Sequence, residues 1–171
     1  MKKNNIILIG MPASGKSTMG VVLAKILGYN FIDADIAIQE AEGRKLSEII
    51  ATDGVDGFIE IENKVNASIE AEKTVIATGG SVVYGKEAMD HYKNLGKIVY
   101  LKVDMDTLTK RLRNVKQRGV VMRPEQSLVS LYNERSTLYE QYADVTIDEK
   151  DHSIEEVIAD ILAALESLKR Q

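Results

Sequence analysis

Hydrophobic positions along the chain gather in five short runs separated by longer amphipathic segments. The runs span residues 5–10, 30–33, 73–77, 97–103 and 144–148, and each is mostly apolar. Strands that are apolar throughout are typical of a parallel sheet covered on both faces. The intervening segments are long enough for crossover helices, which parallel strands require. The pattern predicts a three-layer α/β fold with a five-stranded parallel sheet and helices on both faces.

Helical periodicity is clearest in three of the amphipathic segments. A helix from Met19 to Leu27 is indicated by apolar residues at helical spacing, namely Met19, Val22, Leu23 and Leu27. A second helix over residues 54–72 carries an apolar stripe formed by Phe58, Ile61, Val65 and Ile69. The last helix begins at a capping box, because Ser153 is followed three residues later by Glu156.

Two stretches break the alternation of strands and helices. Residues 34–62 hold more helix than a minimal crossover needs, and residues 114–127 are basic at their start and lack a clean period. Loops above a rigid sheet commonly carry function. We expect an acceptor-binding region over 34–62 and a short closing lid over 114–127, with two plain surface loops as the alternative.

Composition narrows the class of protein. The 171 residues suggest one domain over 1–171, and a net charge of −4 argues against a general nucleic-acid-binding surface. The absence of cysteine excludes disulfides and thiolate metal sites. Because we find neither a signal peptide nor an apolar run of about 20 residues, we expect a cytoplasmic protein without a membrane partner.

The segment Gly10-Met11-Pro12-Ala13-Ser14-Gly15-Lys16-Ser17-Thr18 fits the P-loop pattern G-x-x-x-x-G-K-[ST]. It starts where the first apolar run ends and where a helix follows, which is the context the motif needs. Backbone N–H groups of such a loop point at a polyphosphate, and the helix N-terminus adds partial positive charge. Lys16 is then expected to reach the β- and γ-phosphates of ATP, and the Ser17 hydroxyl to bind Mg²⁺.

Two carboxylates follow the second strand, in the sequence Phe31-Ile32-Asp33-Ala34-Asp35. Ligands of doubly wound sheets gather at the carboxyl ends of the strands. One of these acids is placed to orient Mg²⁺, and the other to accept the proton of an attacking hydroxyl. The alternative reading is helix capping, for which aspartate is also well suited.

Glycines and arginines further along the chain complete the candidate site. The third strand ends at Thr78, Gly79 and Gly80, with no acid in the usual Walker-B place, which favours Asp33 for the metal. Glycines there allow a ligand to approach the backbone closely. Arg135, on a helix, is suited to a bidentate grip on a carboxylate, although a helical arginine is more often a solvated surface residue. Basic residues before and inside the lid are candidates for stabilising transferring phosphate.

The order and spacing of these blocks resemble the shikimate kinase family over nearly the whole chain. The matching blocks are GMPASGKST at 10–18, FIDADIAI at 31–38, ATGGSVV at 77–83, Arg123-Pro124, and NERSTLYEQYADVTID at 133–148. The resemblance implies a P-loop fold of the nucleoside monophosphate kinase type. It also implies transfer of the γ-phosphate of MgATP to a ring hydroxyl of shikimate by a monomeric enzyme of aromatic amino-acid biosynthesis.

Roles carry over from the family by position. The resemblance implies catalytic roles for Lys16, Asp35 and Arg123, where Asp35 is the base and Arg123 the lid arginine near the transferring phosphate. It assigns ATP to Gly10, Ala13, Ser14, Gly15, Lys16, Ser17, Thr18 and, against adenine, Arg113. It assigns Mg²⁺ to Ser17 and Asp33, and the acceptor to Asp35, Gly79, Gly80, Arg135 and position 59.

Two departures from the family both concern the acceptor. The family has a Phe-Arg-x-x-Glu pattern whose arginine pairs with the shikimate carboxylate, whereas this chain reads Phe58-Ile59-Glu60-Ile61-Glu62. The lid after Arg123-Pro124 is also shorter than in most members. A different acceptor such as homoserine is therefore a rival hypothesis, with its carboxylate on Arg135 and its ammonium on Glu60 or Glu62. A nucleotide-binding regulator without catalysis is a third.

Overall fold

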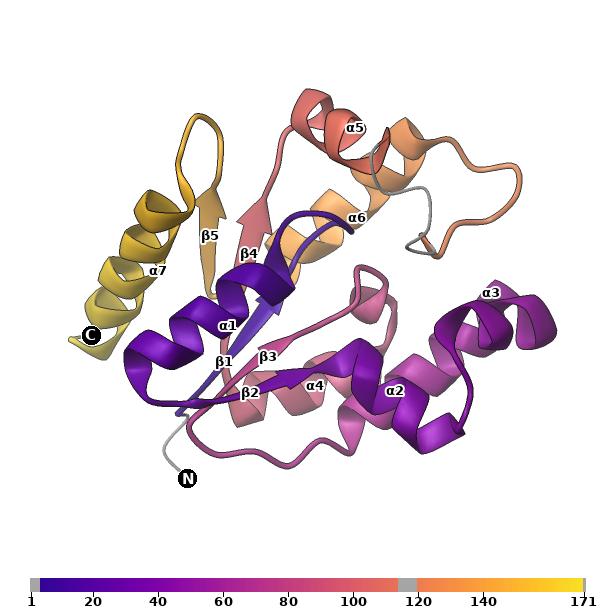
Figure 1. The fold of residues 1–171 in the computed structure, drawn as a ribbon, viewed down its shortest axis with the longest axis horizontal. Coiled ribbons are helices and arrows are strands. Elements are labelled where there is room, and N and C mark those ends of the chain that lie inside the picture. The colour runs from indigo at the N-terminus through magenta and orange to yellow at the C-terminus, as the bar shows by residue number, and fades with distance from the viewer. Residues whose placement is uncertain (1–3, 114–119, 171) are drawn as a thin grey trace.

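The computed structural model describes residues 4–113 and 120–170. Its core is a parallel sheet in the order β2-β3-β1-β4-β5 (Figure 1). The strands are β1 (Asn5–Ile9), β2 (Asn30–Asp33), β3 (Thr74–Ala77), β4 (Gly96–Lys102) and β5 (Val145–Asp148). The predicted five-stranded parallel sheet is confirmed, with each strand boundary within one residue of the hydrophobic run.

Helices connect the strands and cover the sheet. They are α1 (Lys16–Leu27), α2 (Ala34–Glu42), α3 (Leu46–Ala67), α4 (Lys86–Leu95), α5 (Met105–Arg113), α6 (Leu128–Tyr142) and α7 (Ile154–Lys169). A single 3₁₀ turn, η1 (Val82–Tyr84), follows β3. The predicted cap of the last helix is confirmed, because the Ser153 hydroxyl accepts from the Glu156 amide while the Glu156 carboxylate accepts from the Ser153 amide. No helix among the described residues is long and apolar enough to cross a membrane.

Alternate residues of the central strands face two separate hydrophobic clusters. On β1, Ile6 and Leu8 pack with residues of α1 and α7, whereas Ile7 and Ile9 pack with residues of α4 and α6. Both sets of side chains are buried, which is why the strand reads as continuously apolar. Figure 1 shows α1 in front of the sheet and α4 behind it.

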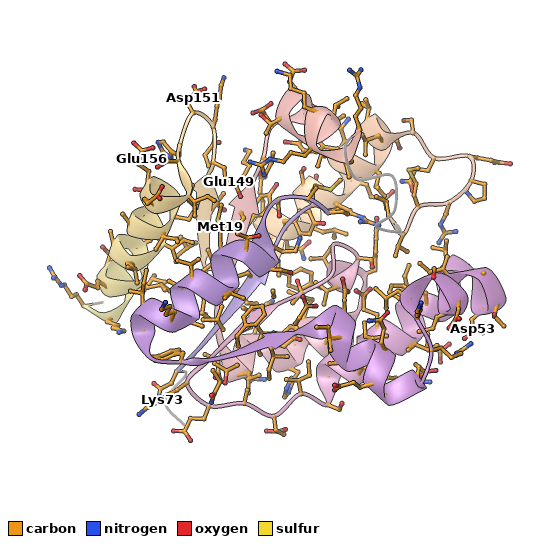
Figure 2. The ribbon with its side chains drawn as sticks, viewed as in Figure 1. Met19, Asp53, Lys73, Glu149, Asp151 and Glu156 are labelled. Atoms are coloured by element: carbon orange, nitrogen blue, oxygen red, sulfur yellow. The ribbon has the colours of Figure 1, made fainter. Side chains whose placement is uncertain are left out.

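The prediction that Val22 belongs to the buried apolar face of α1 is wrong. Met19, labelled in Figure 2, and Leu23 are buried in the cluster between α1 and the sheet, but Val22 is 37% exposed. The helix instead turns Gly20 inward, where an added Cβ would lie 2.7 Å from a ring carbon of Phe31. The close approach of α1 to β2 thus depends on Gly20, which a search for apolar residues at helical spacing does not detect.

The acceptor-region helix differs from the prediction at both ends. α3 begins at Leu46 rather than 54, is interrupted at Gly54 (φ 73°, ψ 179°), and ends at Ala67. Ile69 is buried but lies beyond the helix, because the Ser68 hydroxyl and amide both bond back to the Val65 carbonyl. Together, α2 and the first part of α3 confirm that residues 34–62 hold more helix than a minimal crossover.

The predicted lid lies partly outside the described residues. Residues 114–119 are not described, and residues 120–127 form no helix or strand before α6 begins at Leu128. The Val121 side chain is buried with Phe58 and Ile49, so the described part of this segment packs on the acceptor-region helices.

Candidate functional site

A cavity of about 130 Å³ opens at the carboxyl ends of the strands, between the P-loop and the helices α2, α3 and α6. We call it the central cavity. Nine of the predicted site residues line it, namely Ala13, Gly15, Lys16, Ser17, Thr18, Asp35, Gly79, Gly80 and Arg135. The fold therefore brings the predicted phosphate and acceptor residues to one place.

The P-loop takes its shape from residues with positive φ. Gly10 has φ 151°, and a Cβ there would lie 2.7 Å from the Leu101 carbonyl oxygen. Gly15 caps α1 with φ 87°, and Ala13 adopts φ 64° although it is not glycine. Ser14 is fully buried and belongs to the loop's own framework. These conformations turn the loop back upon the N-terminus of α1, as anion binding requires.

The Lys16 ammonium is held inside the loop. Its Nζ donates to the Gly10 and Met11 carbonyls at 2.9 and 2.8 Å and to the Ser14 hydroxyl at 3.3 Å. Burial lowers the pKa of Lys16 to about 8, against the opposing pull of the Asp35 charge. A partly desolvated cation at the N-terminus of a helix is well placed to meet phosphate oxygens.

Asp33 has two structural partners at once. Its Oδ2 accepts from the Ser17 hydroxyl at 3.0 Å, and its Oδ1 accepts from the Asp35 amide at 3.0 Å as the N-cap of α2. The capping alternative for this residue is therefore correct, and it coexists with contact to the P-loop serine. No cluster of three or more His, Cys, Asp or Glu side chains suited to a metal occurs in the described ranges. A hydroxyl and a carboxylate are nonetheless the hard oxygen donors that Mg²⁺ takes alongside phosphate and water.

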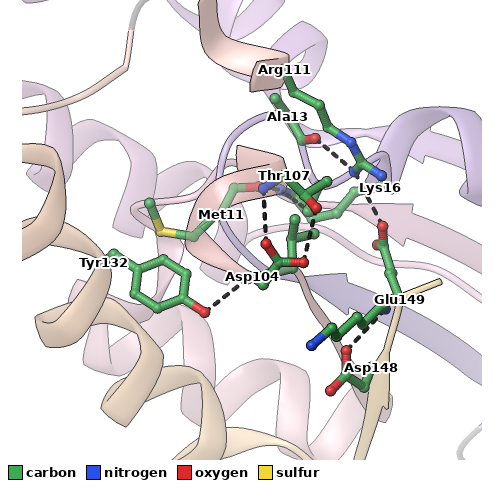
Figure 3. Close-up of polar contacts among 12 residues, drawn as sticks. Met11, Ala13, Lys16, Asp104, Thr107, Arg111, Tyr132, Asp148 and Glu149 are labelled. Carbon is green, nitrogen blue, oxygen red and sulfur yellow. Dashed lines mark hydrogen bonds and ion pairs between the residues drawn. The ribbon is translucent and has the colours of Figure 1, made fainter. Parts of the chain in front are cut away.

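Arg111, rather than Arg113, contacts the phosphate loop (Figure 3). Its Nη1 donates to the Ala13 carbonyl and to Glu149 Oε2, both at 3.1 Å. Glu149, just after β5 (Figure 2), is 6% exposed, and burial raises its pKa. Arg113 is exposed at the end of α5. Its predicted packing on adenine stays a prediction.

Asp35 and Glu62 converge on the backbone of Gly79. A Cβ at Gly79 would lie 2.7 Å from Glu62 Oε1 and 3.0 Å from Asp35 Oδ1. Two carboxylates thus point at one spot on the acceptor side of the central cavity. Only a residue without a side chain leaves room there for both acids and for a ligand.

Glu62, one of the two acids that the homoserine hypothesis names, is a buried member of the site. It is 1% exposed, and its Oε2 accepts from the Ser81 hydroxyl at 2.5 Å. Its Oε1 is buried and has no hydrogen-bond partner within the described part of the chain. Burial raises the pKa of Glu62 to about 7, with Asp35 adding to the rise and Ser81, Arg135 and Lys16 opposing it.

Arg135 is the most deeply buried cation of the site, at 1% exposure. Its Nη2 donates to the Val121 carbonyl, and its Nε lies 3.4 Å from the Tyr84 hydroxyl. Its Nη1 has no hydrogen-bond partner among the described residues and lies 3.0 Å from a Cβ built on Gly80. The solvated alternative for this helical arginine is therefore wrong, because the side chain points into the protein.

Ile59 and Arg123 lie outside the central cavity but share a neighbouring one. This side cavity, of about 180 Å³, is lined by both residues and by Arg135, Tyr84 and Val55. Position 59 thus faces the acceptor side, as the resemblance implies. Arg123 Nη2 pairs with Asp56 Oδ1 at 2.8 Å. The predicted role of Arg123 at the transferring phosphate stays a prediction.

Glu60 points away from both cavities. Its Oε1 pairs with Lys64 Nζ at 2.7 Å, and its side chain is 67% exposed. Of the two acids that the homoserine hypothesis names as ammonium partners, Glu60 therefore faces away from the acceptor side, whereas Glu62 lines the central cavity.

Sequence reasoning missed Ser81 and Glu149 as members of the site. It named Glu62 only as the partner of an amino-acid ammonium, and Arg111 only as one of the basic residues before the lid. Ser81 directly follows the glycine pair, and Glu62 ends the Phe58–Glu62 block, so their places near known motifs were available signals. The Arg111–Glu149 pair carries no local signal, because it joins residues 38 positions apart.

Comparison with known proteins agrees with this geometry. A family model described as "Shikimate kinase" matches residues 12–166. A relative named "Shikimate kinase 1" from Citrobacter koseri is 36% identical over 170 residues, covering 97% of this chain and 98% of the relative. Neither the family model nor this relative names a different acceptor.

Solved structures show the same likeness. A structure entitled "Shikimate kinase from Acinetobacter baumannii in complex with shikimate" is 30% identical, has a TM-score of 0.87, and covers 99% of this chain and 97% of its own. A shikimate kinase from Aquifex aeolicus is also 30% identical, with a TM-score of 0.78, and covers 96% of this chain and 98% of its own. A family match over most of the length and a shared fold together place the chain in the shikimate kinase family, which consists of ATP-dependent small-molecule kinases.

Proposed function

We propose that this protein phosphorylates a ring hydroxyl of shikimate with the γ-phosphate of ATP. The observation that carries the proposal is the meeting of Lys16, Asp35 and Arg135 around one cavity. They provide a phosphate-binding cation, a carboxylate and a carboxylate-binding cation. Shikimate presents a carboxylate and ring hydroxyls, which are the groups that such a set recognises. The solved structure of the Acinetobacter baumannii relative, which is in complex with shikimate, supports this choice.

The phosphate side binds ATP through the P-loop backbone and Lys16. On ATP binding, Lys16 exchanges its carbonyl partners for the β- and γ-phosphate oxygens. Ser17 and Asp33 would hold Mg²⁺, which when bound neutralises charge on the β- and γ-phosphates. The 3.0 Å contact between their oxygens keeps both donors at the mouth of the loop.

The acceptor side orients the hydroxyl that reacts. Asp35 accepts the proton of this hydroxyl while the hydroxyl oxygen attacks the γ-phosphorus of ATP. The bond between that phosphorus and the bridging oxygen breaks, and ADP leaves with this oxygen. Gly79 and Gly80 let the ring approach the backbone, and Arg135 binds the carboxylate through Nη1, which has no hydrogen-bond partner among the described residues. Glu62 Oε1 is placed to accept from a further ring hydroxyl.

The test is an ADP-release assay coupled to NADH oxidation, run with MgATP and a panel of shikimate, homoserine, gluconate and nucleoside monophosphates. We expect turnover with shikimate and background rates with the others. A homoserine rate above the shikimate rate would overturn the proposed acceptor. ATP binding without transfer to any acceptor would overturn the proposed reaction.

We also propose that the protein acts as a monomer. Analytical ultracentrifugation at micromolar concentration should give a single species near 18.9 kDa, the mass of one chain. A species of twice that mass would contradict this.

A further inference from the structure

Two contacts join the short segment from Val121 to Arg123 to the acceptor side of the molecule. The Val121 carbonyl accepts from Nη2 of the buried Arg135. Two residues later, Arg123 Nη2 pairs with Asp56 Oδ1 at 2.8 Å. Asp56 lies on α3 three residues before Ile59, so the two side chains share a face of the helix. Arg123 is therefore held beside Ile59.

Two of the three Arg135 nitrogens already face protein acceptors, so a carboxylate that takes a two-bond fork from Arg135 competes with those acceptors. Its Nη2 is used by Val121 and its Nε faces the Tyr84 hydroxyl at 3.4 Å. The atom left without a partner in the described structure is Nη1. A bidentate grip needs two parallel N–H donors at the carboxylate. A second cation within reach would bind the other carboxylate oxygen without that competition.

The side cavity offers one other cation to that oxygen. Of the described residues that line it, Arg123 and Arg135 carry positive charge, while α3 contributes the apolar Val55 and Ile59. Two acids also line the cavity, and each has a partner: Asp56 accepts from Arg123, and Glu134 accepts from the Tyr84 hydroxyl. Arg123 uses Nη2 for Asp56, which leaves Nη1 and Nε available for a second anion. The Arg123 and Asp56 side chains are 64% and 80% exposed, so their pair contributes little energy and can readjust around a ligand.

We propose that Arg123 binds the carboxylate of the acceptor together with Arg135, and that Asp56 positions it for this. The inference rests on the proposed function, because it concerns the acceptor named there. It differs from the expected role of Arg123 at the transferring phosphate. Arg123 lines the side cavity with Ile59 and is not among the residues lining the central cavity with Lys16. The positive charge that α3 lacks at position 59 is thus supplied across the cavity by the segment before α6.

The test separates acceptor binding from phosphoryl transfer. R123M should raise KM for shikimate roughly tenfold or more, as expected when a charge-assisted hydrogen bond is lost. KM for ATP should stay unchanged and kcat should fall by less than KM rises. The double variant I59R/R123M should recover most of the lost affinity, because an arginine is returned to the same cavity from its other wall. R123M should lose little toward the methyl ester of shikimate, which has no carboxylate.

Asp56 gives a second variant with a matched control. D56N should raise KM for shikimate a few-fold, because Arg123 loses its anchor. D53N removes the aspartate three residues earlier on α3, which pairs with Arg44 at 2.8 Å (Asp53 is labelled in Figure 2), and should leave KM unchanged.

Three results would count against the inference. An R123M variant with an unchanged KM and a collapsed kcat would return Arg123 to the phosphate. Failure of I59R to restore KM in the double variant, or equal effects of D56N and D53N, would show that no carboxylate site lies here. If the wild-type enzyme turned over shikimate in these same assays, such results would overturn the inference alone. A wild-type enzyme inactive on shikimate would overturn the proposed function and the inference with it.

Discussion

The phosphate half and the acceptor half of the site are built in different ways. The phosphate half comes from one unbroken stretch, residues 10–18, in which the Lys16 ammonium already has three oxygen partners. The acceptor half is assembled from α2, α3, the turn after β3, the segment before α6, and α6 itself. It also holds two buried atoms, Glu62 Oε1 and Arg135 Nη1, that have no hydrogen-bond partner within the described residues.

This difference shows which half can change while the chemistry stays. A P-loop depends on local backbone conformation, so few substitutions in it are tolerated. An acceptor pocket made from several segments can lose a cation on one wall and gain it from another. Ile59 and Arg123 illustrate this, because they line the same side cavity from opposite segments.

The largest effect should come from breaking the phosphate half. K16A removes a cation that balances phosphate charge in the transition state, and we expect kcat to fall by roughly 10²–10³-fold or more. KM for shikimate should change much less. Steady-state ADP release measures both. K25A, which removes a lysine from the exposed last turn of the same helix, serves as the control and should keep wild-type kinetics.

The next effect should come from crowding the acceptor half. In G79A the new Cβ would lie 2.7 Å from Glu62 Oε1 and 3.0 Å from Asp35 Oδ1. We expect KM for shikimate to rise about tenfold, of the order of a 1–2 kcal/mol steric penalty, with the Kd for ATP unchanged. Equal losses for both substrates, measured by calorimetry and kinetics, would mean that the two halves are not separable.

A third prediction concerns stability against pH. Burial raises the pKa of Glu62 from 4.5 to about 7, so the folded protein binds more protons than the unfolded chain between these values. The free energy of unfolding should therefore fall as pH rises from about 4.5 to 7, by up to about 3 kcal/mol from this one group. In the E62Q variant, the free energy of unfolding should not show this fall with pH. Lys16 acts in a separate window, because its pKa of about 8 makes stability rise between pH 8 and 10.5.

Urea denaturation of E62Q and wild type at pH 5, 6, 7 and 8 checks this. E60Q is the matched control on the same helix, since Glu60 is solvent-exposed and paired with Lys64. If the free energies of unfolding of wild type and E62Q changed in parallel from pH 5 to pH 8, Glu62 would ionise as freely in the folded protein as in the unfolded chain, and the prediction would be wrong.

The smallest effect should come from adding charge to the acceptor half. I59R in the wild-type background should lower KM for shikimate about two- to fivefold, the gain typical of a solvent-screened ion pair. The gain is small because Arg123 and Arg135 already face this cavity. Initial-rate kinetics at saturating ATP measure it, and a higher KM would indicate that Ile59 makes an apolar contact with the substrate.

The sequence predicted the sheet and the phosphate half well, because both depend on local signals. Each strand boundary fell within one residue, and the P-loop residues lie where the motif implied. Val22 and Ile69 were misplaced by periodicity alone, since Gly20 turns one helix and Ser68 ends another.

The acceptor half was less predictable because its contacts join distant residues. Glu62 meets Ser81 across 19 positions, Arg135 meets Val121 across 14, and Arg123 meets Asp56 across 67. No pattern within a helix or strand encodes these pairs. The family resemblance located position 59, but the cation that faces it could be found only in three dimensions.

The central claim is that the two halves meet so that Asp35 activates an acceptor hydroxyl beside ATP held by the P-loop. The most direct test measures D35N twice, by turnover with shikimate and by calorimetric binding of MgATP. We predict that kcat falls by about 10²–10⁴-fold while the Kd for MgATP changes less than threefold. Near-normal turnover in D35N would contradict the account.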